Sequence, residues 1–275
     1  MFFKDDDVVD SLLKDKEFEL FQNLIFKSAG ISITIAKKAL VAGRLNKRLK
    51  HHQLATFSDY YKLITSSNGA EELQTCVDLL TTNETYFFRE PKHFEFLRQQ
   101  VLPHVSAGKT FRLWSGASSS GEEPYSLAMT LAERLGSTPW EIIGSDISTQ
   151  ILAKARAGHY PMARATNIEQ SLLVKYCLKG TGSQAGTFLI DPSLRVRLKF
   201  MHINLNENLP NIGEFDVIFL RNVMIYFNQE TKIKVVARML PLLKVGGYFI
   251  VSHSESLNGI NDYLKMVTPS IYRKP

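Results

Sequence analysis

The chain is poor in cysteine and in long apolar segments. Only two of its 275 residues are cysteines, Cys76 and Cys177, and they lie in different parts of the sequence. A disulfide framework is therefore not expected, and a reducing cytoplasm fits this composition. No unbroken apolar run reaches about 18 residues, so the sequence predicts no transmembrane helix and no membrane insertion. Residues 5–7 are all aspartate, where a signal peptide would be basic and then apolar.

Motifs for nucleic acid and for metal are also missing. The net charge of +6 favours an anionic partner. There is no zinc-finger spacing, RNP-type aromatic motif or homeodomain-like helix, so no nucleic-acid partner is expected. The seven histidines show no ligand spacing, and we expect the adjacent His51 and His52 to point apart on a helix. The sequence therefore predicts no metal site.

The chain contains two regions of different periodicity. Residues 8 to about 80 show helical spacing, whereas strands and helices alternate from residue 110, which predicts a parallel sheet with helices on both faces. The expected helices lie at residues 37–51, 57–64, 71–80, 124–135, 149–157 and 231–243. The expected strands lie at residues 110–114, 140–145, 198–204, 215–220 and 248–252. A short extended link is expected at 31–35, a helix stop at Gly246-Gly247, and a closing hairpin at 263–273.

One long segment, residues 159–197, interrupts this alternation. An ordinary connection in such a fold is much shorter. It contains a predicted helix at 168–178, a Gly-rich turn at 180–186, and extended pieces at 187–191 and 194–197. We interpret it as a small inserted antiparallel lobe. The expected organisation is a helical domain over 1–80 and an α/β domain over 81–275 that carries the lobe.

The most informative turn follows the strand at 110–114. Small residues occupy 115–121 and lead into a helix, as in nucleotide-binding α/β units where backbone approaches a ligand closely. Glu122 and Glu123 then stand where a phosphate-binding loop would carry Lys-Ser or Lys-Thr. A neutral ribose or a positively charged ligand fits better than pyrophosphate, and S-adenosylmethionine offers both. A plain structural turn is the alternative.

Asp146 follows the predicted strand at 140–145, 25 residues after Gly121. A carboxylate at this place binds ribose hydroxyls in dinucleotide-type folds. The alternative is an N-cap role, because Asp or Ser is favoured just before the helix that begins at Thr149.

Two further segments combine polar and aromatic residues. Residues 81–91 include Arg89 and lie at the expected domain junction, where ligand sites are common; the alternative is a capped helix start with Phe87 and Phe88 in the core. Asn222 and Tyr226 follow the buried strand at 215–220, at the end where α/β sheets bind ligands. Tyr226 is otherwise an interface aromatic.

The predicted helix at 37–51 carries a basic face. Its apolar residues fall in one arc, and Arg44, Lys47 and Arg48 fall in the neighbouring one. This face is either an ordinary solvated surface or a docking surface for an acidic protein partner.

Four motifs taken together closely resemble the CheR family, the chemotaxis receptor glutamate O-methyltransferases. They read TTNETYFFRE at 81–90, WSGASSSGEEPYS at 114–126, GSDIS at 144–148 and RNVMIYF at 221–227. The resemblance implies a Rossmann-like S-adenosylmethionine-dependent methyltransferase domain after an all-helical domain. It implies S-adenosylmethionine as methyl donor, S-adenosylhomocysteine as product, and glutamates on the cytoplasmic helices of chemoreceptors (methyl-accepting chemotaxis proteins) as acceptors.

The resemblance also implies roles for individual residues. Arg89 and Tyr226 would face the reaction centre, and the basic face of 37–51 would dock the receptor. In some members the inserted lobe binds a peptide from the receptor C-terminus. The implied cofactor contacts are Asn83, Thr85, Arg89, Glu122, Asp146, Asn204, Leu205, Arg221 and Asn222. Glu123 is expected only as a charge favoured by the helix dipole.

Three other functions compete with this one. The chain could methylate a different acceptor, because the motifs define the cofactor better than the substrate. It could be a signalling adaptor that keeps the fold without catalysis, although Asn83, Arg89, Asp146 and Tyr226 are intact. A nucleic-acid methyltransferase is disfavoured, because no Asn-Pro-Pro-Tyr-like motif follows the strand at 215–220.

Overall fold

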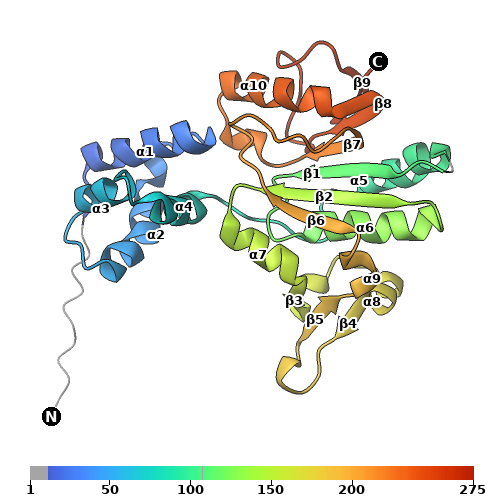
Figure 1. Cartoon of the computed structure of the whole chain (residues 1–275), viewed down its shortest axis with the longest axis horizontal. Coiled ribbons are helices and arrows are strands. Elements are labelled where there is room, and N and C mark those ends of the chain that lie inside the picture. The colour runs from blue at the N-terminus through green and yellow to red at the C-terminus, as the bar shows by residue number, and fades with distance from the viewer. Residues whose placement is uncertain (1–11, 107) are drawn as a thin grey trace. The chain divides into compact units, whose positions relative to one another are not determined.

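The computed structural model describes residues 12–106 and 108–275. The expected start of the helical region at residue 8 therefore lies outside the described residues. The chain divides into two compact units, residues 1–81 and residues 82–275 (Figure 1). Within the described ranges, no helix has the length and apolar character needed to cross a membrane.

The first unit is helical. Its α-helices are α1 (Asp15–Ala29), α2 (Lys38–His51), α3 (Phe57–Ile64) and α4 (Ala70–Leu80). The helices predicted from residues 37, 57 and 71 are confirmed, with starts that agree within one residue. The link predicted at 31–35 does connect two helices, with a single bridge at Ile31 and extended backbone at Thr34, and only its last residue differs, because Ile35 begins a 3-10 helix, Ile35–Lys37.

Aromatic packing and one buried carboxylate hold the first unit together. Phe21 of α1 packs against Phe57 and Tyr60 of α3, with ring centroids 6.3 and 6.1 Å apart. Glu17 of α1 is buried and accepts bonds from the Ser58 backbone and hydroxyl at 2.9 and 2.7 Å. These bonds give the buried carboxylate its hydrogen-bond donors, and they give a backbone N–H in the first turn of α3 the acceptor that its own helix cannot provide.

The second unit is built on a seven-stranded sheet in the order β6-β2-β1-β7-β8-β10-β9. Its strands are β1 (Phe111–Gly116), β2 (Trp140–Asp146), β6 (Leu198–His202), β7 (Phe215–Leu220), β8 (Leu243–Ile250), β9 (Lys265–Thr268) and β10 (Ile271–Arg273). The five strands from β6 to β8 are parallel, and β10 joins β8 and β9 in antiparallel pairing. The predicted parallel sheet and closing hairpin are both confirmed.

Of the four main helices of the α/β unit, the first precedes the sheet and the other three follow strands, as the alternation predicts. They are α5 (Pro91–Phe96), α6 (Glu122–Leu135), α7 (Thr149–Ala157) and α10 (Gln229–Met239). Strand β7 is fully apolar apart from Asp216 and is buried from Val217 to Leu220. Such continuous apolar strands belong in the centre of a sheet that is covered on both faces. The carboxyl ends of β1, β2 and β7 consequently lie side by side at one edge.

The helix stop predicted at Gly246-Gly247 is wrong. Helix α10 ends at Met239 and becomes a short 3-10 helix, Leu240–Leu242, because Pro241 has no N–H to continue the α-helix. Both glycines lie inside β8, which begins at Leu243, earlier than predicted. A Cβ at Gly247 would approach the Asp216 carbonyl oxygen to 2.9 Å, so the glycine allows β8 to lie close to β7 at this point.

The inserted antiparallel lobe is confirmed. Its sheet has the order β3-β5-β4, formed by β3 (His159–Pro161), β4 (Cys177–Lys179) and β5 (Thr187–Ile190), with α8 (Gln170–Tyr176) beside it. The extended piece predicted at 194–197 is wrong, because α9 (Pro192–Arg195) forms there. Asp191 accepts the Ser193 N–H, and Pro192 occupies the first turn, which together favour a helix start.

Phe188 attaches the lobe to the rest of the α/β unit. Its ring is 1% exposed and lies 5.6 Å from Tyr160 and 5.8 Å from Phe87. We expect Phe188→Ala to lower the free energy of unfolding by about 3–5 kcal/mol, because a large cavity replaces the ring. Chemical denaturation measures this, with Val174→Ala, which is 73% exposed, as the control. Equal losses in both variants would contradict the assignment.

Candidate active site

The turn between β1 and α6 is tight and buried. Ala117 and Ser119 have φ of +55° and +49°, and Gly121 has φ of +95°. A Cβ at Gly121 would lie 3.0 Å from the Ala155 side chain and from the Tyr160 hydroxyl, so only glycine fits. The Tyr160 hydroxyl donates to the Ser120 carbonyl at 2.6 Å. The fold therefore presents backbone, rather than side chains, at the carboxyl end of β1.

Asp146 lies directly against this turn. The residue is 6% exposed, and its carboxylate accepts the Ser119 N–H at 2.9 Å and the Ser148 N–H at 2.9 Å. The cap of α7 is Ser148, whose hydroxyl accepts from Ile151, so the interpretation of Asp146 as the N-cap residue is wrong. The carboxylate instead joins the ends of β1 and β2, where a ligand of such a fold binds.

Two other segments that are predicted to contact the cofactor lie beside Asp146. The Ser119 hydroxyl donates to the Asn83 carbonyl at 3.0 Å, which fixes the segment that also carries the buried Thr85. The Ile203 N–H donates to the Asp146 carbonyl at 3.1 Å and places Asn204 and Leu205 just beyond it. Residues far apart in sequence are thus gathered around the end of β2.

Glu122 is fully buried and ion-paired. Its carboxylate accepts the Ser120 hydroxyl at 2.6 Å and pairs with the guanidinium of Arg164. Burial and the neighbouring Glu122 charge raise the pKa of Tyr160 well above its ordinary value. The structure therefore places Glu122 as a link between the turn and the lobe. Arg164 was not found from the sequence, because no motif connects it with a partner 42 residues away.

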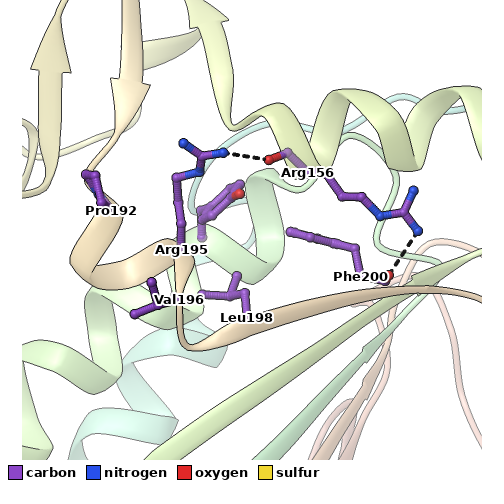
Figure 2. A pocket seen from close by; sticks show the side chains of 7 residues that line it. Arg156, Pro192, Arg195, Val196, Leu198 and Phe200 are labelled. Atoms are coloured by element: carbon purple, nitrogen blue, oxygen red, sulfur yellow. Dashed lines mark hydrogen bonds between the residues drawn. The ribbon is translucent and has the colours of Figure 1, made fainter.

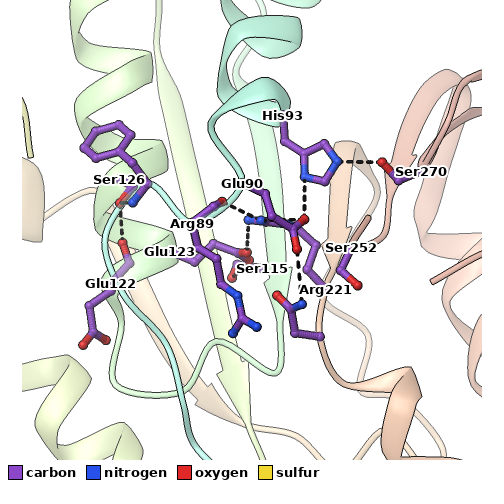
Figure 3. Close-up of polar contacts among 12 residues, drawn as sticks. Arg89, Glu90, His93, Ser115, Glu122, Glu123, Ser126, Arg221, Ser252 and Ser270 are labelled. Carbon is purple, nitrogen blue, oxygen red and sulfur yellow. Dashed lines mark hydrogen bonds and ion pairs between the residues drawn. The ribbon is translucent and has the colours of Figure 1, made fainter. Parts of the chain in front are cut away.

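Glu123 has specific partners and is more than a helix-dipole charge. It accepts the Ser115 hydroxyl at 2.7 Å and Arg221 Nη1 at 2.8 Å. The Arg221 side chain is 1% exposed, and its Nη2 donates to the Arg89 carbonyl at 2.5 Å and to Glu90 at 3.0 Å (Figure 3). One buried guanidinium thereby connects β7, the start of α6 and the Arg89 turn.

The Arg89 turn has an unusual backbone. Phe88 and Glu90, the residues on either side of Arg89, both have positive φ, +53° and +59°. The Phe88 N–H donates to the Ser126 hydroxyl at 2.9 Å, while the Arg89 guanidinium donates to the Glu84 carbonyl at 3.0 Å and lies over the Tyr86 ring. The capped-helix alternative for this segment is wrong about the helix, because α5 begins only at Pro91, although Phe87 lies in the core and Phe88 packs against it, as that alternative expected.

The turn after β7 lies beside the Arg89 turn. Asn222 has φ of +58°, and its side-chain amide donates to Glu90 at 3.3 Å. Tyr226 ends a short 3-10 helix, Met224–Tyr226, and is half-buried. Burial alone would raise the pKa of Glu90, but the charge and hydrogen bonds of Arg221 outweigh it and lower that pKa. Glu90 therefore stays ionised between two turns.

The fold also gathers histidines that the sequence separates. One potential ligand atom each from Glu90, His93 and His253 lies within 4.8 Å of the others. Burial and the Arg221 charge lower the pKa of His93 to about 3. The Glu90 oxygen involved already meets Arg221 Nη2 at 3.0 Å and the His253 N–H at 3.2 Å. These donors satisfy the carboxylate, and the nearby guanidinium repels a metal cation.

The expectation that His51 and His52 point apart is wrong. Their ring centroids lie 4.8 Å from each other, in an edge-to-face arrangement.

The basic face of α2 is largely committed to its own domain. Arg44 donates to the Leu79 and Thr81 carbonyls at 3.0 and 2.9 Å, at the end of α4. Arg48 pairs with Glu72 at 2.5 Å. Lys47, in contrast, is exposed. Of the three predicted docking residues, two therefore support the helix packing.

A cavity of about 430 Å³ lies between the inserted lobe and β6 (Figure 2). Leu198 and Phe200 form its apolar side. Arg195 donates to the Arg156 carbonyl, and Arg156 donates to the Phe200 carbonyl, each at 3.0 Å. No residue predicted to contact the cofactor lines it.

Comparison with known proteins agrees with this geometry. The family model of the CheR methyltransferase SAM-binding domain matches residues 83–272, and that of the CheR all-alpha domain matches residues 16–81. The chain belongs to the CheR methyltransferase family. It is consequently an S-adenosylmethionine-dependent methyltransferase with an all-helical first domain.

Relatives match over most of the chain. A chemotaxis protein methyltransferase of Escherichia coli is 38% identical over 263 residues, which cover 94% of this chain and 91% of the relative. Chemotaxis protein methyltransferase 2 of Pseudomonas aeruginosa is 38% identical, with 94% and 92% covered. A chemotaxis protein methyltransferase of Borreliella burgdorferi is 34% identical, with 96% and 95% covered.

Asp146 offers a direct test of the cofactor site. We expect Asp146→Ala to weaken S-adenosylmethionine binding by about 1.5–3 kcal/mol, as loss of a charge-assisted hydrogen bond does. Titration calorimetry measures the change. Asp191→Ala is the matched control, because Asp191 also accepts a backbone N–H, from Ser193 at 2.8 Å, but lies in the lobe. Equal affinity in the wild type and Asp146→Ala would remove Asp146 from the site.

Proposed function

We propose that this protein transfers a methyl group from S-adenosylmethionine to glutamate side chains on the cytoplasmic helices of chemoreceptors, giving γ-methyl esters and S-adenosylhomocysteine. Membership of the CheR family and the names of its relatives support a chemotaxis role. The observation that carries the site assignment is Arg221, which fastens the Arg89 turn to the start of α6. We further propose that the protein acts in the cytoplasm.

The residues around the turn suit this cofactor. The turn has small side chains, so a ligand could approach its backbone closely, and we propose that the carboxylate of Asp146, which accepts the Ser119 N–H, also accepts the ribose hydroxyls. We propose that Asn83, Thr85, Asn204, Leu205 and Asn222 complete the cofactor pocket. We propose that Glu122 stabilises the wall of this pocket through its ion pair with Arg164. Arg221 would lie behind the pocket and contribute by positioning the Arg89 turn.

The proposed reaction depends on the alignment of methyl donor and acceptor carboxylate more than on acid–base catalysis. When bound, S-adenosylmethionine supplies a methyl group activated by the sulfonium. Glutamate has an ordinary pKa of about 4.3, so the acceptor is already ionised near neutral pH and no general base is required. Its oxygen forms the new bond to the methyl carbon while the carbon–sulfur electron pair returns to sulfur. Proximity and orientation therefore supply most of the effect.

Arg89 is our candidate for steering the acceptor carboxylate. Among the described residues its guanidinium has no carboxylate partner within ion-pair distance, and its observed contacts are the neutral Glu84 carbonyl and the Tyr86 ring. A charge-assisted hydrogen bond to a substrate carboxylate is consequently open to it. We propose that Tyr226, half-buried on the neighbouring turn, positions the methyl group.

Label transfer tests the reaction. Radiolabelled S-adenosylmethionine is incubated with receptor cytoplasmic fragments, and we expect base-labile label on the fragments. Because no group of the enzyme has to exchange a proton, the single-turnover rate should be flat between about pH 6 and 8. Fragments with glutamine in place of the accepting glutamates are the control. Base-stable label, or a steep bell-shaped rate profile, would contradict this mechanism.

We also propose that the basic face of α2 docks the receptor, and that the inserted lobe binds a receptor C-terminal peptide. Arg44 and Arg48 are committed to α4, so the better probes are Lys47, the exposed residue of this face, and Lys50, an exposed lysine further along α2. We expect Lys47→Glu with Lys50→Glu to lower kcat/KM for the receptor about tenfold and to leave cofactor affinity unchanged.

Lys16→Glu with Lys62→Glu, which alters exposed positions on α1 and α3, is the matched control for that charge change. Equal losses in the two double variants would show that overall charge, rather than the α2 face, governs docking.

A further inference from the structure

The segment after β8, residues 252–255, contains a glutamate that the site described above does not use. Glu255 lies beyond the end of β8, next to the turns that carry Arg89 and Tyr226. Its carboxylate accepts three backbone N–H groups, from Asn222 at 3.0 Å, Ile225 at 3.2 Å and Ser252 at 3.0 Å. Two of these donors belong to the turn after β7. The side chain therefore clamps that turn to the end of the neighbouring strand.

The turn needs such a clamp. Asn222 has φ of +58°, a conformation that costs energy in a residue other than glycine and persists only where the surroundings impose it. The Tyr226 and Phe227 N–H groups are bonded within the turn, to Val223 and Met224. The N–H groups of Asn222 and Ile225 point instead to Glu255. Without an acceptor there, two backbone donors of the strained turn would lose their partners.

Hydrogen bonds within its own segment also fix the position of Glu255. Its own N–H donates to the Ser252 carbonyl at 3.0 Å, while the fully buried Ser252 donates to the carboxylate. The next residue along, His253, donates its N–H to Glu90 at 3.2 Å. One short segment thus braces both turns of the site, and Glu90 closes the connection by accepting from Asn222.

A catalytic part for the carboxylate does not fit these contacts. Its two oxygens already accept three bonds, and among the described residues it has no cationic partner within ion-pair distance. The methyl transfer proposed above needs no base. We infer that Glu255 is a positioning residue, which sets the place of Asn222 and Tyr226 by clamping the backbone of the turn between them. This inference rests on the proposed function for its effect on rate.

Glu255→Gln is the sharpest variant. A carboxamide keeps the shape but has one accepting oxygen, so it can retain the bonds at Oε2 and then presents an NH₂ group to the Ile225 N–H. Hydrogen exchange followed by mass spectrometry tests the clamp without reference to activity. We expect faster exchange of the amides at 222–226 in Glu255→Gln and no change in Asn258→Ala, which alters an exposed side chain three residues further along the chain. Unchanged exchange in Glu255→Gln would overturn the clamp.

A double-mutant cycle tests the effect on catalysis. At saturating substrates we expect Glu255→Gln and Tyr226→Phe each to lower kcat about tenfold, with little change in the receptor KM. If Glu255 acts through Tyr226, the double variant should be little slower than either single one, whereas independent effects would multiply to about a hundredfold. Multiplying effects, or a wild-type kcat in Glu255→Gln, would overturn the positioning role.

The outcomes separate the two proposals. A wild-type protein that does not label receptor fragments refutes the proposed function, and with it the effect on rate, while hydrogen exchange still decides whether the clamp exists. Thermal unfolding is measured for every variant. If Glu255→Gln unfolds below the assay temperature, Glu255→Asp, which keeps the charge and lacks one methylene, enters the same cycle with the same expected coupling.

Discussion

The buried guanidinium of Arg221 is the interaction on which the site depends. A charge removed from water costs several kcal/mol unless its partners are close and well oriented. Arg221 has Glu90 and Glu123 as counter-ions and the Arg89 carbonyl as a third acceptor. Three chain segments must therefore stay where they are for the charge to remain satisfied. The position of Arg89 is a consequence of that requirement, because its own carbonyl is one of the acceptors.

Backbone strain is concentrated around the same carboxyl ends of the strands. Seven residues other than glycine have positive φ within 12–106 and 108–275, and five of them belong to the three turns of the site: Phe88, Glu90, Ala117, Ser119 and Asn222. Such conformations persist only where surrounding contacts over-determine them. Here carboxylates accept the turn backbone or side-chain amides, as Asp146 does for Ser119 and Glu90 for Asn222. The acidic residues of the site thus hold the backbone of these turns in place.

Local sequence patterns predict much of the fold, and the predictions of secondary structure that are wrong also have local causes. Strand β7 and helix α7 were predicted with their observed bounds, because an apolar run and an amphipathic period are strong signals. The predicted end of α10 is wrong because Pro241, and not Gly246-Gly247, ends the helix. The sequence pattern at 194–197 predicts an extended piece, although Asp191-Pro192 begins a helix there. In both cases the stronger signal, a proline, was present in the sequence.

The sequence by itself determined the order of the elements, the inserted lobe and the motifs that mark the ends of β1, β2 and β7. These are local or regularly spaced features, and the physics that produces them acts over a few residues. Only the tertiary structure decided which carboxylate serves which partner. Glu122 pairs with Arg164, Glu123 with Arg221, and Glu255 with the turn after β7. These partners are 30 to nearly 100 residues apart, and the parallel sheet brings them together by aligning strand ends that the chain itself keeps apart.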